Sequence, residues 1–167
     1  MNHNSLKEII SWIATHGITA YSAKAIERDL NIQLDDSLQS APSVISKVLL
    51  DALNAAQLTT GIQSPSSTDD FFDVMLTFLE NLSDYKADFQ TLFNQNNLSF
   101  ESFNLVPVVN ELTQTLLNSK IETFLDKITY TIIICNILYT WINDETPDLS
   151  STLTKINHVA LSIFVSS

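Results

Sequence analysis

Residues able to do chemistry are few and scattered along this sequence. His3, His16 and His158 have no second histidine three or four positions away, the spacing that places two metal ligands on one helix face. Cys135 is the only cysteine, which excludes a cysteine-cluster metal site and an intramolecular disulfide. We therefore predict no metal ion, no cofactor and no catalytic residue, and hence a non-enzymatic protein.

Neighbouring acidic residues form three pairs that could serve as general acid and base. They are Asp35–Asp36, Asp69–Asp70 and Asp144–Glu145. Each pair falls near the predicted start of a helix, where the helix dipole favours negative charge. We interpret all three as helix-capping groups.

The most apolar stretch is Ile121–Asn143, which contains no Gly or Pro and can form one helix of roughly 34 Å. One helical stripe is wholly apolar: Ile121, Leu125, Ile128, Ile132, Cys135, Tyr139 and Ile142. A helix that is apolar on most of its circumference must be buried on more than one side. Its uninterrupted run is shorter than the ~18–20 residues of a membrane span, so we predict none.

The composition favours a compact all-α protein. The chain has 167 residues, 45% of them hydrophobic, with only two Gly and four Pro, and no stretch alternates as a strand does. We expect eight or nine helices. The amino terminus, MNHNSLKEII, lacks the order of a signal peptide, so we expect a soluble, cytoplasmic protein.

Capping residues divide the amino-terminal part into four helices. The first begins at Ser5 and ends at Gly17, the second runs from Ser22 to Asn31, a third covers Leu34–Ser40, and Ser43 caps the fourth. Residues Leu58–Ser67, with Gly61 and Pro65, form a linker. The predicted domains are therefore 1–57 and 68–167.

Helical patterning continues after the linker. Further helices begin at Thr68, at Ser83 and at Pro107, with a polar loop at Asn94–Asn104, then the apolar helix, a break at Asn143–Pro147 and a last helix over Asp148–Val165.

Three short helices, a capped fourth and a larger helical region resemble the tetracycline-repressor (TetR) family of regulators. The residues that carry the resemblance are Gly17, Ser22 with Ile26, the turn at Leu30–Ile32 and the pair Pro42–Ser43. The resemblance implies a helix-turn-helix domain at residues 1–57, followed by a helical domain for dimerisation and ligand binding.

The carboxy-terminal half resembles a narrower, alphaproteobacterial subgroup of this fold, akin to lipid-binding accessory proteins of ubiquinone biosynthesis. Asp69–Phe93 and Trp141–Leu153 carry this likeness. It implies an apolar pocket for a small molecule or a lipid, although the same spacing also fits an ordinary core. The candidate pocket residues are Phe72, Met75, Phe78, Phe89, Phe93, Tyr130, Ile134 and Trp141.

The helix that would read DNA departs from the family pattern. Where DNA-binding members carry tyrosine, basic and aromatic residues, this chain has Leu38, Gln39, Ser40, Ala41 and Val44. Asp35 and Asp36 would repel phosphates, and the net charge of −11 adds to the repulsion. If DNA is bound, the contacting residues are Lys24, Arg28, Ser37 and Gln39.

Dimerisation is the partner interaction that the resemblance implies, since the last two long helices of the TetR fold form a four-helix bundle across a two-fold axis. The candidate interface residues are Leu125, Ile132, Ile133, Tyr139, Ile156 and Ala160. We therefore expect a homodimeric, TetR-like regulator with weakened or lost DNA binding, acting through an apolar ligand or a protein partner. The alternatives are a lipid-binding accessory protein of quinone or lipid metabolism and an authentic DNA-binding repressor.

Overall fold

The computed structural model describes residues 3–94 and 106–165. In these two ranges the chain forms eight α-helices, short 3-10 turns and loops, and no β-strand. The prediction of an all-α fold is therefore confirmed. The loop predicted at Asn94–Asn104 lies outside the described residues, except that Asn94 is the last residue of a helix.

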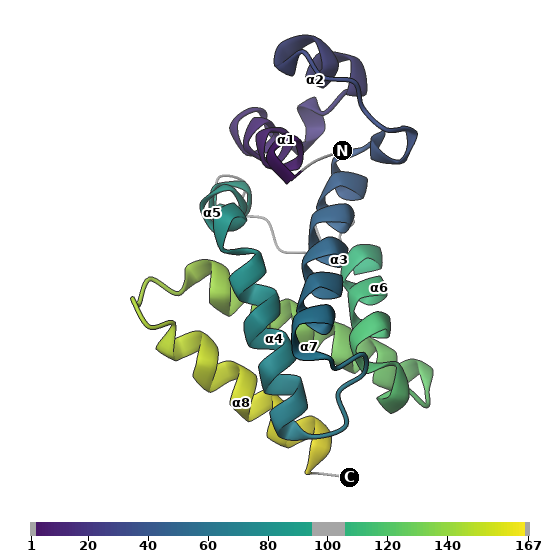
Figure 1. The fold of residues 1–167 in the computed structure, drawn as a ribbon, viewed down its shortest axis with the longest axis vertical. Helices are drawn as coiled ribbons and strands as arrows, with labels where there is room; N and C mark the ends of the chain where they lie inside the picture. Colours follow the sequence, from purple (N-terminus) through teal and green to yellow (C-terminus); the bar gives the residue numbers. More distant parts are fainter. Residues whose placement is uncertain (1–2, 95–105, 166–167) are drawn as a thin grey trace.

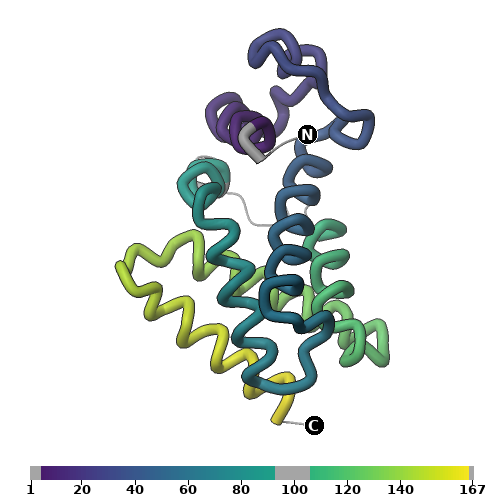
Figure 2. Tube along the Cα trace, in the orientation of Figure 1, coloured from purple at the N-terminus to yellow at the C-terminus, as the bar shows by residue number. Residues whose placement is uncertain are grey.

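The helices form two groups joined by the long helix α3. Their bounds are α1 (His3–His16), α2 (Ala23–Leu30), α3 (Ala41–Thr60), α4 (Thr68–Asn81), α5 (Lys86–Asn94), α6 (Val106–Leu117), α7 (Phe124–Asn143) and α8 (Ser150–Phe164). Helices α1 and α2 lie at the end of the molecule where α3 begins, and α7 and α8 lie toward its other end (Figure 1). Helix α4 packs against both α3 and α8, while α6 packs between α3 and α7. The tube in Figure 2 shows α7 turning back into α8.

Several helix ends fall where the capping residues predict them. Gly17 follows α1 with a φ of 86°, a conformation that favours glycine. The Ser22 side chain accepts a hydrogen bond from the Ala25 backbone N–H and caps α2. Asn31 ends α2 in the left-handed conformation, with a φ of 52°. These ends are set by local chemistry, which explains why the sequence predicts them.

The predicted third helix at Leu34–Ser40 is wrong. Only a single 3-10 turn forms there, over Asp36–Leu38. The Asp35 carboxylate accepts a hydrogen bond of 2.9 Å from the Ser37 backbone N–H, so this side chain stabilises a tight turn in place of a longer helix. Helix α3 then starts at Ala41 with Ser40 as its cap, three residues before the predicted cap at Ser43.

The apolar helix α7 begins at Phe124, three residues later than predicted. Thr123 and Asp126 form a capping box, in which the Asp126 backbone N–H donates to Thr123 and the Thr123 backbone N–H donates to Asp126. Hydrogen bonds from Thr123 lower the pKa of the Asp126 carboxyl below its usual value. Helix α8 begins at Ser150 because Leu149 takes a left-handed conformation with a φ of 53°.

One buried cluster runs through both groups of helices. It includes Ile9 and Ile13 of α1, Leu53 of α3, Phe78 of α4 and Trp141 of α7. Helix α3 extends three residues past the predicted domain end at residue 57, and the loop from Gly61 to Ser67 lies inside the predicted linker. The division into two domains stays a prediction.

Candidate functional site

The exposed face of α7 is apolar along most of its length. Leu125, Ile132 and Tyr139 are 72%, 54% and 55% exposed, and Phe124 and Ile128 are exposed beside them. The opposite face of α7 is buried through Ile134, Ile137, Leu138 and Trp141. A helix that is apolar on its outer face as well as its inner face has a surface that a partner or ligand would cover.

The outer residues follow a heptad spacing. Leu125, Ile128, Ile132, Cys135, Tyr139 and Ile142 are separated by alternating steps of three and four residues, which is the pattern of a coiled-coil seam. We call this set the α7 stripe. Only Ile142, at its carboxyl end, is buried within the chain. The stripe is therefore patterned for packing against a helix, but most of it is open in the described part of the chain.

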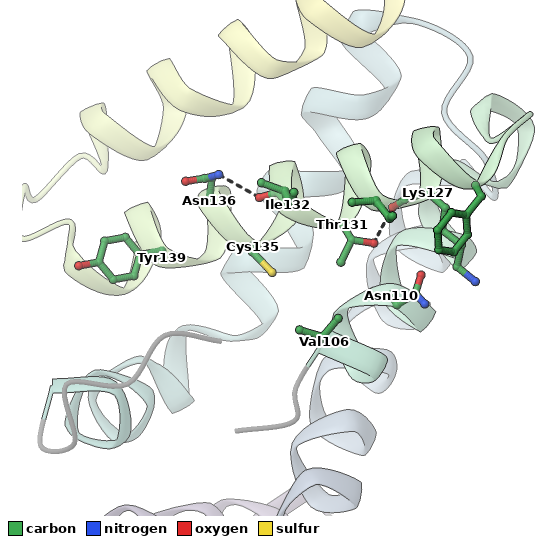
Figure 3. Close-up of a pocket in the computed structure, with 10 residues that line it drawn as sticks. Val106, Asn110, Lys127, Thr131, Ile132, Cys135, Asn136 and Tyr139 are labelled. Carbon is green, nitrogen blue, oxygen red and sulfur yellow. Dashed lines mark hydrogen bonds between the residues drawn. The ribbon is translucent and has the colours of Figure 1, made fainter. Parts of the chain in front are cut away.

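A groove lies between α6 and α7 and borders this stripe (Figure 3). Its volume is about 560 Å³, within the range of small-molecule sites. Val106 and Asn110 contribute from α6. The residues that line it from α7 are Phe124, Lys127, Ile128, Thr131, Ile132, Cys135, Asn136 and Tyr139. The apolar stripe thus forms one wall of a cavity as well as an outer surface.

Most polar groups of the groove lie at one end, whereas Asn136 lies nearer Tyr139. Figure 3 shows Asn110, Lys127 and Thr131 at that end and Tyr139 at the other. The Lys127 ammonium donates to the Gln114 side-chain oxygen at 3.3 Å, a neutral partner. Thr131 donates its hydroxyl to the Lys127 backbone oxygen at 2.7 Å. The groove is therefore amphipathic, with a cation at one end and an apolar body.

Asn110 has an unusual environment in this end of the groove. Its side-chain oxygen is buried and has no hydrogen-bond partner among the described residues. A buried acceptor without a partner costs about 1–3 kcal/mol, because its bond to water is lost and not replaced. Such an atom is uncommon in a folded protein, and it identifies a position where a hydrogen-bond donor is missing.

The residues predicted to line a ligand pocket lie elsewhere. Met75, Phe78 and Ile134 are fully buried, and Phe89 and Trp141 are almost so. Phe72 and Tyr130 are partly buried and pack against the same core. The Phe93 side chain lies outside the described residues. None of the described members of this set lines the groove.

The predicted interface residues separate into two groups. Leu125, Ile132 and Tyr139 are exposed and lie on the stripe. Ile133 is partly buried against the core, and Ile156 and Ala160 of α8 are buried within the chain. Sequence reasoning did not select Lys127 or Asn110, because only the packing of α6 on α7 brings these two side chains together. The signal that the sequence offers is that Lys127 is the one basic residue of α7.

The predicted DNA-contacting residues Lys24, Arg28, Ser37 and Gln39 are all exposed. However, the Arg28 guanidinium donates to the Asp29 carboxylate at 2.8 Å, so an acidic group lies beside its charge. This contact lowers the pKa of Asp29 below its usual value.

The described residues hold no group of three His, Cys, Asp or Glu side chains arranged to bind a metal ion. None of the described helices combines the length and the apolar character needed to cross a membrane. Comparison with protein-family models, with curated proteins and with solved structures finds no match for the chain. The chain is thus an all-helical protein whose α6–α7 groove and α7 stripe are the features from which a function can be argued.

Proposed function

We propose that this protein is a non-enzymatic homodimer of the TetR-like regulator type, with weakened or lost DNA binding. It acts through an apolar ligand or a protein partner bound by its carboxy-terminal helices. The observation that carries this proposal is the open, heptad-spaced stripe on α7.

A second copy of the chain is the partner that the stripe fits best. Its exposed members are aliphatic or aromatic and uncharged, so the stripe is complementary to itself across a two-fold axis. In a chain with a net charge of −11, an uncharged strip avoids the repulsion that two copies would otherwise face. Pairing of α7 with its symmetry mate would remove these side chains from water, at a gain of about 1.5–3 kcal/mol for each one fully buried.

Loss of DNA binding is supported by the amino-terminal helices. The element expected to read DNA is a 3-10 turn over Asp36–Leu38, too short to lie along a major groove as a recognition helix does. Asp35 and Asp36 at that turn would face the phosphates of an approaching duplex, and Arg28 is already paired with Asp29. Little positive charge therefore remains on the amino-terminal helices to neutralise DNA phosphates.

The dimer is tested by sedimentation velocity on three chains. The wild type is expected to sediment as a dimer, and Leu125→Glu as a monomer, because two carboxylates would meet in the interface. Leu58→Glu is the matched control, since Leu58 is 78% exposed on α3, away from the stripe. A monomeric wild type, or a Leu125→Glu variant that stays dimeric, contradicts the proposal.

The proposed loss of DNA binding is tested by fluorescence anisotropy with genomic DNA fragments at low salt. We expect no saturable binding. Saturable submicromolar binding that weakens as salt rises would contradict the loss of DNA binding and favour an authentic repressor.

A second candidate function is a lipid-binding accessory protein, and the groove favours it. The groove is mostly apolar, and four residues of the stripe line its α7 wall: Ile128, Ile132, Cys135 and Tyr139. Native mass spectrometry of the purified chain reports dimer mass and a co-purifying lipid together. A monomer carrying a lipid supports the accessory protein over the regulator.

A further inference from the structure

We propose that the α6–α7 groove binds a long-chain fatty acid, with the carboxylate at the Lys127 ammonium and the acyl chain along α7 toward Tyr139. This inference deepens the proposed function, since it names the class of the apolar ligand and the residue that recognises its head.

The shape of the groove suits a single extended chain. Lys127 and Tyr139 are twelve residues apart on one helix, a distance of about 18 Å along its axis. Between them the groove is lined by Ile128, Ile132 and Cys135 and by two polar residues, Thr131 and Asn136. The volume of about 560 Å³ is in the range of ligand sites. A mostly apolar body with a cation at one end matches an amphiphile with one tail.

The charge at the polar end selects the head group. The chain contains 19 acidic and 8 basic residues, yet among the described residues the charged side chain that lines the groove is a lysine and none is a carboxylate. In a chain with more acidic than basic residues, the charge that the described residues place in the groove is opposite in sign to the net charge of −11. A negatively charged head is therefore favoured at Lys127 and a cationic head is disfavoured.

Two acidic side chains near the groove residues in sequence, Asp126 and Glu111, accept hydrogen bonds from other groups. Asp126 accepts hydrogen bonds from the Thr123 backbone and hydroxyl at the start of α7. Glu111 of α6 accepts from the Ser46 hydroxyl of α3 at 3.5 Å. Lys127 itself donates to the neutral Gln114 side chain alone among the described residues. Since an ammonium has three donors, Lys127 retains the capacity to bind a carboxylate.

The ligand site and the proposed dimer contact can be separated by mutation. Leu125 belongs to the stripe but does not line the groove, whereas Lys127 lines the groove but does not belong to the stripe. Because Ile128, Ile132, Cys135 and Tyr139 of the stripe also line the groove, the two proposals share a surface, and Leu125 and Lys127 are the positions at which each can be changed separately.

Isothermal titration calorimetry of the full chain with myristic acid, below its micelle concentration and at neutral pH, tests the site. Wild type is expected to bind about one myristate per chain, and Lys127→Met about tenfold more weakly, because the charged contact with the carboxylate is lost. Lys127→Arg should keep the affinity within about threefold, and it also shows that position 127 tolerates substitution. Lys24→Met is the matched control, since Lys24 is exposed on α2.

Two further probes check the head-group assignment. Tetradecanol and tetradecyltrimethylammonium, which have 14 carbons in the chain and a neutral or a cationic head, should both bind more weakly than myristate to the wild type. Equal binding of tetradecanol and myristate, equal binding by wild type and Lys127→Met, or no binding to the wild type would overturn the proposal.

The two proposals fail in different ways. A wild-type chain that binds myristate but sediments as a monomer overturns the dimer and supports the fatty-acid site. A wild-type dimer that dissociates in Leu125→Glu but binds no myristate overturns the fatty-acid site alone.

Discussion

The Asp144 carboxylate receives two hydrogen bonds of 2.7 Å from Thr152, one from the backbone N–H and one from the hydroxyl. Its other oxygen accepts from the Thr146 backbone N–H and hydroxyl. Asp144 is only 5% exposed, at the corner where α7 ends and α8 begins. The Lys86 ammonium of α5 donates to the Asp144 backbone oxygen at 2.6 Å. One aspartate therefore fixes the angle between α7 and α8 and connects both to α5.

Replacing Asp144 should destabilise the fold without removing any apolar contact. Asp144→Asn keeps the size of the side chain but turns an amide N–H₂ toward donors that need an acceptor. We expect the free energy of unfolding to fall by about 2 kcal/mol, the effect of leaving buried donors unpaired. Urea denaturation followed by circular dichroism measures this. Glu145→Gln, an exposed neighbour, is the control and should change the free energy by no more than about 0.5 kcal/mol.

Asp144 should also make the free energy of unfolding depend on pH in the acidic range. Burial alone would raise the pKa of this carboxyl, but the hydrogen bonds from Thr146 and Thr152 outweigh it, and its pKa in the folded chain lies well below the usual value. The contribution to stability is therefore fully present above the unfolded pKa of about 3.9 and is lost as the pH falls from there toward the lower folded pKa.

The measurement for this pH dependence is the difference in unfolding free energy between wild type and Asp144→Asn. That difference should be constant from about pH 7 to about pH 5 and should shrink at about pH 3. A difference that stays the same at the lowest pH would show that the carboxylate is not the source of the stability.

Local capping chemistry explains which helices the sequence predicts correctly. The ends at Gly17, Ser22 and Asn31 depend on a few adjacent residues, and each lies where expected. The helix predicted at Leu34–Ser40 does not form, because the Asp35 side chain competes with helical hydrogen bonding over this short segment. With few apolar residues to pack, that segment gains too little from burial to override the turn.

The sequence predicts the exposed stripe on α7 but not the groove between α6 and α7. The apolar spacing on Ile121–Asn143 selects Leu125, Ile132 and Tyr139, all of which lie on the exposed stripe. Spacing does not say which of two apolar faces the rest of the chain covers, so it predicts pocket positions at Ile134 and Trp141, which the structure buries in the core. The groove depends on how α6 packs on α7, and the spacing of apolar residues within each helix does not predict that packing.

The left-handed conformation of Asn31 gives a local test of the turn after α2. Asn31 is exposed with a φ of 52°. Asn31→Ala should lower the free energy of unfolding by about 1 kcal/mol, because a β-carbon without a local hydrogen bond is strained there. Asn31→Gly should leave the free energy within about 0.5 kcal/mol, since glycine adopts this conformation freely. Thermal unfolding gives the free energy of unfolding of both variants. An equal loss in Asn31→Ala and Asn31→Gly would contradict backbone strain at position 31.

The buried oxygen of Asn110 predicts a stabilising substitution. Asn110→Leu replaces the amide by an apolar side chain of similar size, which removes an acceptor that has no partner among the described residues. We expect the free energy of unfolding to rise by about 1 kcal/mol, because the desolvation cost of the unpaired oxygen disappears. Asn157→Leu on the exposed face of α8 is the control and should change it by no more than about 0.5 kcal/mol. Chemical denaturation of both variants gives the comparison, and a destabilised Asn110→Leu variant would mean that the amide makes a contact the fold requires.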